Sequence, residues 1–167
     1  MRGFYWLIED ALAGCARPGG SGARRTGALE TEGELAALDA DLAWLREQGI
    51  GAVLSLTETP LDAAALERYE LESLHVPIDD MTAPVPEQFD SALRFIDWQR
   101  VRGQRVVVHC KMGQGRTGVI LAAYLVRLGV TPAQALARVR AVCPGAVENR
   151  EQEHALDAFA SRRDWII

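Results

Sequence analysis

The side chains best suited to chemistry lie in residues 106–118, Val-Val-Val-His-Cys-Lys-Met-Gly-Gln-Gly-Arg-Thr-Gly. Three β-branched residues predict a buried strand that ends at His109, and a glycine-bearing turn and a helix start follow Cys110. Glycines let the backbone curl so that successive N–H groups point inward, and the helix directs its positive end at the same point. Arg116 adds a planar guanidinium that can bind two phosphate oxygens at once. We therefore expect a phosphate cradle made by Lys111, Met112, Gly113, Gln114, Gly115 and Arg116.

Cys110 lies at the base of this expected cradle. N–H donors, a helix N-terminus and a guanidinium favour the thiolate over the thiol. A thiolate beneath a bound tetrahedral anion is a nucleophile aimed at phosphorus. The loop is not a nucleotide-binding loop, which ends in Gly-Lys-Ser/Thr, because here the order is Gly115-Arg116-Thr117.

Cys110, five further residues and Arg116, with His109 before and Thr117 after, resemble the signature of the cysteine-dependent protein-tyrosine phosphatase superfamily. The pattern His-Cys-x-x-Gly-x-Gly-Arg-Thr-Gly is most similar to that of small atypical dual-specificity phosphatases. The resemblance extends over residues 4–160, with further counterparts at 53–58, 77–80, 122–125 and 144–152. It implies an enzyme that hydrolyses phosphate monoesters on proteins through a cysteinyl-phosphate, without metal or cofactor.

A phosphate ester also needs a proton on its leaving oxygen, so a carboxylic acid should lie above the cradle. Asp79 and Asp80 are the candidates, between Pro77 and Pro84. The family pattern Pro-Ile-x-Asp-x-x-x-Pro assigns the acid to Asp80, whereas Asp79 is typical of a turn-capping residue. The same group would then act as base on the water that hydrolyses the cysteinyl-phosphate.

The resemblance also gives expectations for three supporting residues. Thr117 would donate a hydrogen bond to the departing thiolate, although it could simply cap the helix start. Gln152 would position water, although a solvated helix position is the alternative. His109 is expected to orient the cysteine loop by hydrogen bonding. The three histidines show no metal-ligand spacing, which argues against a zinc site.

Lys111 is the only lysine among 18 basic residues and lies beside the expected nucleophile. Its position favours an acidic or polyanionic substrate. A phosphoinositide or inositol phosphate phosphatase is therefore the second hypothesis, although such enzymes carry another lysine where this chain has Gln114. A phosphate-binding module without turnover is the third, and intact Cys110, Arg116 and Asp80 argue against it. A sulfur-transfer enzyme is a weaker fourth.

Composition sets the outer bounds. The 167 residues carry a net charge of -5 and show no run of about 20 apolar residues, so we expect neither membrane insertion nor nucleic-acid binding. The three cysteines predict no disulfide scaffold, and together with the lack of a secretory signal they favour the cytoplasm. Cys15 and Cys143 are expected to be spectators unless an oxidised Cys110 pairs with one of them. We expect a monomer.

Hydrophobic periodicity predicts strands that alternate with helices. Strands are expected at 4–8, 51–56, 71–76 and 106–108, and helices at 34–48, 61–69, from 86, at 119–128, 132–142 and 148–160. This order predicts an α/β fold with a central, mainly parallel sheet flanked by helices, protein-tyrosine-phosphatase-like, as one domain over 1–167. Residues 14–33 are expected to form an irregular surface loop that, with 57–84, sets pocket depth, and the tail 165–167 to pack on the domain.

Overall fold

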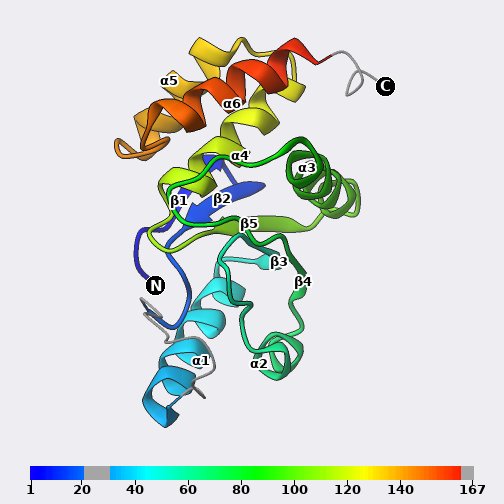
Figure 1. The fold of residues 1–167 in the computed structure, drawn as a ribbon. Coiled ribbons are helices and arrows are strands. Elements are labelled where there is room, and N and C mark those ends of the chain that lie inside the picture. Colours follow the sequence, from blue (N-terminus) through cyan, green and yellow to red (C-terminus); the bar gives the residue numbers. More distant parts are fainter. Residues whose placement is uncertain (21–30, 163–167) are drawn as a thin grey trace.

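A computed structural model describes residues 1–20 and 31–162. These residues form a five-stranded sheet in the order β1-β2-β5-β3-β4 (Figure 1). The strands are β1 (Tyr5–Ile8), β2 (Leu12–Cys15), β3 (Ile50–Ser55), β4 (Glu72–His75) and β5 (Arg105–His109). Only the β1–β2 pair is antiparallel, so the sheet is mostly parallel, and the predicted fold class is confirmed.

Helices cover both faces of the sheet (Figure 1). On one face lie α1 (Glu32–Glu47) and α2 (Ala63–Arg68), and on the other lie α3 (Pro86–Val101), α4 (Gly115–Arg127), α5 (Pro132–Val142) and α6 (Arg150–Ser161). Side chains alternate along each strand, so Val106 and Val108 pack into the core under α3–α6 while Val107 packs into the core under α1 and α2. Burial on both faces explains why the central strands read as continuous apolar runs.

The helix boundaries follow from local capping chemistry. Thr31 caps α1 and forms a capping box with Glu34, so this helix begins two residues before its predicted start. Thr131 caps α5 ahead of Pro132 as expected, and Asn149 caps α6. Helix α4 begins at Gly115 rather than at 119, because the cradle runs directly into its first turn.

The predicted surface loop over 14–33 is wrong at its start. Leu12–Cys15 form a fully buried strand between β1 and β5. Gly14 hid this strand from the sequence pattern, because glycine is rare in strands. The fold nevertheless requires a glycine at position 14, since a Cβ on this residue would lie 2.4 Å from Cζ of Tyr5, whose ring packs across Gly14. Residues 21–30 of that segment and the predicted packing of tail residues 165–167 lie outside the described residues. No described helix has the length and apolar character to cross a membrane.

Candidate active site

The predicted cradle lies where four parallel strands end. Cys110 follows β5, Arg17 follows β2, Glu58 follows β3 and Asp80 follows β4. Carboxyl ends of parallel strands meet at one edge of a sheet, which is where α/β proteins bind ligands. Residues nearly 100 positions apart in the chain therefore converge on a single site.

A pocket of about 220 Å³ opens at this edge, and Cys110 is almost completely buried in it. Its other walls come from the segment after β4, from the cradle itself and from the loop before α6. The lining residues are Asp80, Met81, Cys110, Lys111, Met112, Gly115, Arg116 and Glu148. The pocket thus brings together the predicted nucleophile, the predicted acid and the arginine.

Gly113 fixes the shape of the cradle. Its φ of +76° lies in the left-handed region, and a Cβ there would lie 2.5 Å from the carbonyl carbon and oxygen of Cys15. No other residue fits without moving β2 away from the loop. The Tyr5 hydroxyl donates to the Gly113 carbonyl at 2.7 Å. Burial raises the pKa of Tyr5, so this hydroxyl keeps its proton and turns that carbonyl toward β1.

Arg116 is 2% exposed and is held by three oxygens. Its Nη1 donates to the carbonyl of Ile78 at 2.8 Å and lies 3.2 Å from Oε2 of Glu58. Its Nη2 lies 3.0 Å from Oδ1 of Asp80. A buried guanidinium requires such partners, and a phosphate would replace the Asp80 carboxylate as a paired anion.

Glu58 is a site residue that the sequence reasoning did not assign. Its Oε1 accepts from the backbone N–H of Asp80 at 2.7 Å while its other oxygen faces Arg116. Partial burial raises the pKa of Glu58, but backbone N–H groups and the Arg116 guanidinium outweigh it, so the pKa lies below its usual value. Glu58 is therefore a carboxylate that links Arg116 to residues 79–82, the segment that carries Asp80 and is here called the acid segment. Its place at the end of the 53–58 motif was the available signal.

The two aspartates are separated by their surroundings. Asp80 presents its carboxylate to Arg116 and accepts from the N–H of Met81. Asp79 is exposed, and its carbonyl accepts from both the N–H and the hydroxyl of Thr82. Asp79 thus closes a turn with its backbone, and Asp80 is the carboxylate at the pocket.

Comparison with known proteins agrees with this geometry. A family model described as a polymorphic toxin system DSP-PTPase phosphatase matches residues 22–130. The chain belongs to this DSP-PTPase family. The recognition made from the 109–118 motif is therefore confirmed.

Relatives and solved structures extend the same result. The Arabidopsis thaliana phosphatidylglycerophosphate phosphatase PTPMT2 is 30% identical over 72% of this chain and 55% of its own length. Human dual specificity protein phosphatase 2 is 36% identical over 52% of this chain and 27% of its own length. The crystal structure of Tk-PTP in the active form has a TM-score of 0.78 at 29% identity and covers 95% of this chain and 97% of that one. The chain spans about half the length of the plant relative.

His109 lies under the cradle of this DSP-PTPase domain. Its Nε2 is 2.7 Å from the Ser55 hydroxyl and its Nδ1 is 3.2 Å from the Cys110 carbonyl. Complete burial lowers the pKa of His109 to about 3, even though the Cys110 carbonyl opposes that shift. His109 is therefore neutral at physiological pH and holds the strand end in place.

Gln152 and Thr117 are both fully buried. The alternative of a solvated position for Gln152 is wrong, because its Oε1 accepts from the Glu148 N–H at 2.8 Å and its Nε2 donates to the Thr82 carbonyl at 3.2 Å. Gln152 thereby joins α6 to the acid segment. The Thr117 hydroxyl has no hydrogen-bond partner within the described residues. A buried hydroxyl without a protein partner is unusual and calls for an explanation.

Lys111 is exposed at the rim, and its carbonyl accepts from the Arg17 N–H at 3.1 Å. Arg17 is a second residue that sequence reasoning missed, because it fell in the supposed loop. Its buried guanidinium donates to the Thr57 hydroxyl and to the carbonyls of Thr59 and Pro60. Arg17 thus joins the cradle to the segment after β3.

Cys15 and Cys143 are free, buried thiols. Burial raises the pKa of both, so they are protonated at neutral pH. A thiol in that state is a poor nucleophile. Both were expected to be spectators, and no observation tests the alternative in which an oxidised Cys110 pairs with one of them.

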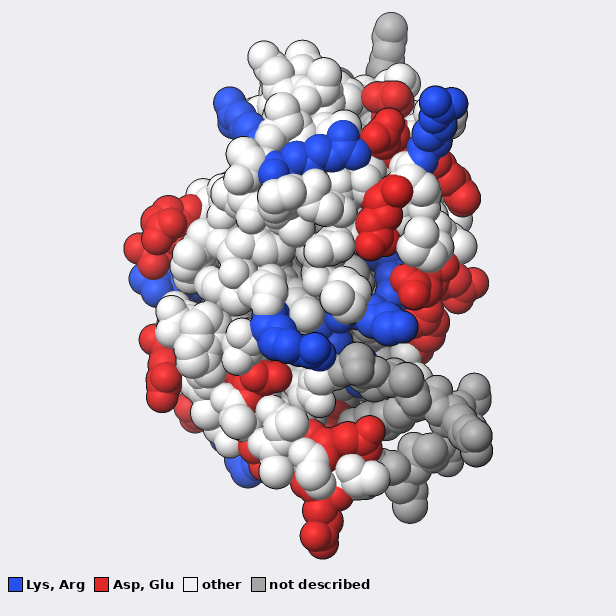
Figure 2. Space-filling view, turned by 90° about the vertical axis from the view of Figure 1, so that its left-hand side faces the viewer, with Lys and Arg blue, Asp and Glu red and all other residues white. Residues whose placement is uncertain are grey.

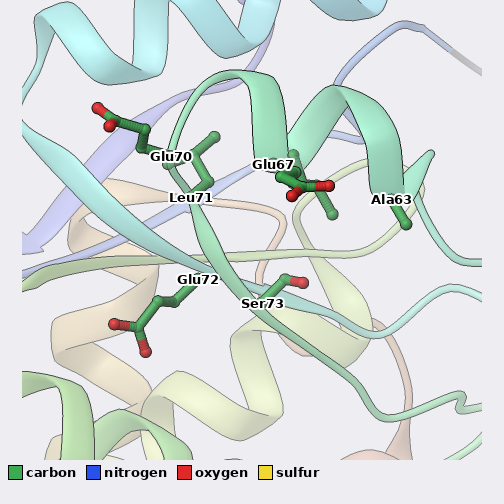
Figure 3. Close-up of a pocket in the computed structure, with 7 residues that line it drawn as sticks. Ala63, Glu67, Glu70, Leu71, Glu72 and Ser73 are labelled. Atoms are coloured by element: carbon green, nitrogen blue, oxygen red, sulfur yellow. The ribbon is translucent and has the colours of Figure 1, made fainter.

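A larger hollow of about 410 Å³ lies between α2 and β4 (Figure 3). The described residues that line it, Ala63, Leu66, Glu67, Glu70, Leu71, Glu72 and Ser73, include three glutamates and no cation. A phosphate dianion would be repelled there. The smaller pocket over Cys110 is therefore the candidate active site.

Proposed function

We propose that this chain is a cysteine-dependent phosphatase that hydrolyses phosphate monoesters on proteins, with phosphotyrosine as the first substrate and phosphoserine and phosphothreonine as further ones. The observation that carries the proposal is the meeting of Cys110, Arg116 and Asp80 in one pocket. A pure phosphate-binding module has no use for a nucleophile and an acid beside the bound anion. Membership of the DSP-PTPase family supports the same reading.

The first half of the proposed cycle forms a covalent intermediate. The Cys110 thiolate attacks phosphorus while inward N–H groups of residues 111–116 and the Arg116 guanidinium stabilise the charge on the three equatorial oxygens. The bond from phosphorus to the leaving oxygen breaks as the S–P bond forms, and Asp80 gives its proton to that oxygen. To do so, Asp80 must exchange Arg116 for the substrate, and the phosphate takes its place on the guanidinium.

The second half returns the enzyme to its starting state. Asp80, now a carboxylate, takes a proton from water, and the resulting oxygen attacks phosphorus while the S–P bond breaks. Thr117 donates to the departing thiolate. Gln152 positions the water, and its amide gives up the Thr82 carbonyl to do so. Inorganic phosphate leaves, and the protonated Asp80 is ready for the next ester.

A phosphoinositide or inositol phosphate substrate is the second candidate. The observation that favours it is the exposed Lys111 at the pocket rim. A relative named as a phosphatidylglycerophosphate phosphatase also supports a small phosphate ester. Rates on a phosphotyrosine peptide and on a soluble inositol bisphosphate, measured side by side, separate the two candidates.

We further propose that residues 1–167 act as a single, monomeric domain in the cytoplasm, without nucleic acid as partner. Three unpaired thiols suit a reducing compartment, and the net charge of -5 does not suit nucleic acid.

The test is hydrolysis of para-nitrophenyl phosphate with EDTA present, for the natural protein and for Cys110→Ser. We expect turnover that EDTA does not affect and that Cys110→Ser abolishes. Phosphate binding without turnover in the natural protein would instead support the binding module. Turnover that needs a metal would contradict the proposed mechanism.

A further inference from the structure

Glu148 brings a second acidic side chain into the pocket over Cys110, in addition to Asp80. It is exposed, and its Oε2 lies so close to Gly115 that a Cβ on that glycine would be 2.3 Å away. Its carboxylate has no ion pair or hydrogen bond within the described residues. An unpaired carboxylate weakens phosphate binding at a site that attracts anions, so the position of Glu148 in this pocket needs an explanation.

The backbone holds Glu148 in this position. Val147, directly before it, has a φ of +59°, which a β-branched residue rarely adopts. Three bonds keep it there: Arg140 donates to the carbonyls of Ala146 and Val147, each at 3.0 Å, and the Val147 N–H donates to the Gln114 carbonyl at 3.3 Å. The Glu148 N–H is bonded to Gln152. The backbone at Glu148 is therefore held by Arg140 of α5, by the cradle and by Gln152 of α6.

The pocket presents both signs of charge. Asp80 and Arg116 are paired with each other, and Glu58 lies against Arg116. This leaves Lys111 and Glu148 as the lining charges without an ion pair in the described part of the chain. On the face of the molecule drawn in Figure 2, basic side chains gather near the middle with acidic side chains next to them.

Two apolar side chains complete the mouth. Met81 and Met112 line the same pocket, and each is 52% exposed. Thioether side chains of this kind make favourable contacts with aromatic rings. They suit a leaving group that is apolar next to its phosphate, such as the phenol of phosphotyrosine.

We propose that Glu148 is a specificity-determining residue that selects phosphotyrosine in a neutral or basic peptide and rejects esters with a second anionic group near the scissile phosphate. This inference rests on the proposed function. A carboxylate beside the bound phosphate repels a neighbouring carboxylate or phosphate and attracts a lysine or arginine. Specificity is gained because the unwanted partner is disfavoured, even at some loss of affinity for the wanted one.

The experiment uses three phosphotyrosine peptides that differ only in the flanking residues, which are lysine, alanine or glutamate. For the natural protein we expect kcat/KM to be about three- to tenfold higher on the lysine peptide than on the glutamate peptide at low salt. This is the range expected when one exposed charge attracts the lysine side chain in one peptide and repels the glutamate side chain in the other. Added salt should shrink this ratio. Glu148→Gln should bring the ratio to one or, because Lys111 remains at the pocket, below one, and Glu148→Asp should keep most of the natural ratio.

Glu151→Gln is the matched control, because Glu151 is an exposed glutamate on the first turn of α6 that does not line the pocket. It should keep the natural ratio. A fold disturbed by substitution would lower all three rates together and leave the ratio unchanged, so the ratio separates specificity from structural damage.

An unchanged ratio in Glu148→Gln would overturn the inference, as would a natural protein that prefers the glutamate peptide, since Lys111 would then govern selection. Failure of the natural protein to hydrolyse para-nitrophenyl phosphate would instead overturn the proposed function. The two failures are therefore distinguishable.

Discussion

The Asp80 carboxylate lies 3.0 Å from the Nη2 atom of Arg116, although the two residues follow different strands of the sheet. Glu58 holds both partners, through the Asp80 N–H and through the guanidinium. Glu58 therefore keeps the backbone of Asp80 next to Arg116. In the proposed cycle a bound phosphate replaces the Asp80 carboxylate on the guanidinium, and the Glu58 contact keeps Asp80 close enough to reach the leaving oxygen.

The first prediction distinguishes Asp80 from Asp79. Asp80→Asn should lower kcat/KM, which reports the steps up to the cysteinyl-phosphate, by about 10²- to 10⁴-fold on phenyl phosphate, whose leaving oxygen needs a proton, and much less on para-nitrophenyl phosphate. Asp79→Asn is the control and should have a small effect on both, because Asp79 uses its carbonyl in the turn. Equal losses of Asp80→Asn on both esters would remove Asp80 from the acid role.

The second prediction concerns the cradle backbone. Gly113→Ala should lower kcat/KM about a hundredfold or more, because the new Cβ would meet Cys15 at 2.5 Å and displace the N–H donors. Gly103→Ala is a close control, since Gly103 has the same φ of +76° but nothing within 4 Å of its Cβ position. Gly103→Ala should cost about 1 kcal/mol of stability and leave kcat/KM unchanged. Equal losses of activity in the two variants would contradict the packing argument.

The third prediction concerns pH and stability. His109 is neutral when folded, with its pKa lowered to about 3, whereas the unfolded chain takes up a proton near its ordinary value of 6.5. Stability is therefore full above pH 6.5 and falls as the pH drops from there toward 3. Between pH 7 and pH 5 this group should remove up to about 2 kcal/mol from the free energy of unfolding, measured by urea denaturation.

His109→Gln should flatten that dependence, and His154→Gln should not, because His154 is exposed on α6. A natural protein as stable at pH 5 as at pH 7 would show that His109 is not held neutral.

The fourth prediction concerns the rim cation. Lys111→Met should lower kcat/KM on an aryl phosphate that carries a second anionic group about two- to fivefold more than on para-nitrophenyl phosphate, and salt should reduce this difference. Uniform loss on both substrates would point to a role of Lys111 in folding of the loop.

The sequence was most informative where local chemistry and tertiary structure agree. The strand up to His109, the glycine turn and the apolar helix after it are local signals, and the structure assembles them as expected. The position of Asp80 was also predictable, because Pro77 and Pro84 bound the short segment that carries it. Long-range contacts left no such trace.

Three differences illustrate this limit. Gly14 and Cys15 were predicted to begin a loop because Gly14 has low strand propensity, and the Tyr5 ring that packs across Gly14 explains why a glycine stands in this strand. Glu58 reaches Arg116 from the segment after β3; the 53–58 motif singled out this segment, but no spacing in the sequence reveals the contact. Gln152 lies on a helix whose neighbouring side chains are polar, so its burial against the acid segment depends on tertiary packing.

The most direct test of the account is to map the phosphoryl group during turnover. Asp80→Asn should slow hydrolysis of the intermediate, so a reaction with para-nitrophenyl phosphate quenched after one turnover should leave one phosphoryl group on the enzyme. We expect mass spectrometry to locate it on Cys110 and to find none in Cys110→Ser. A burst of nitrophenol with the phosphoryl group on another side chain, or with none on the enzyme, would contradict nucleophilic catalysis by Cys110.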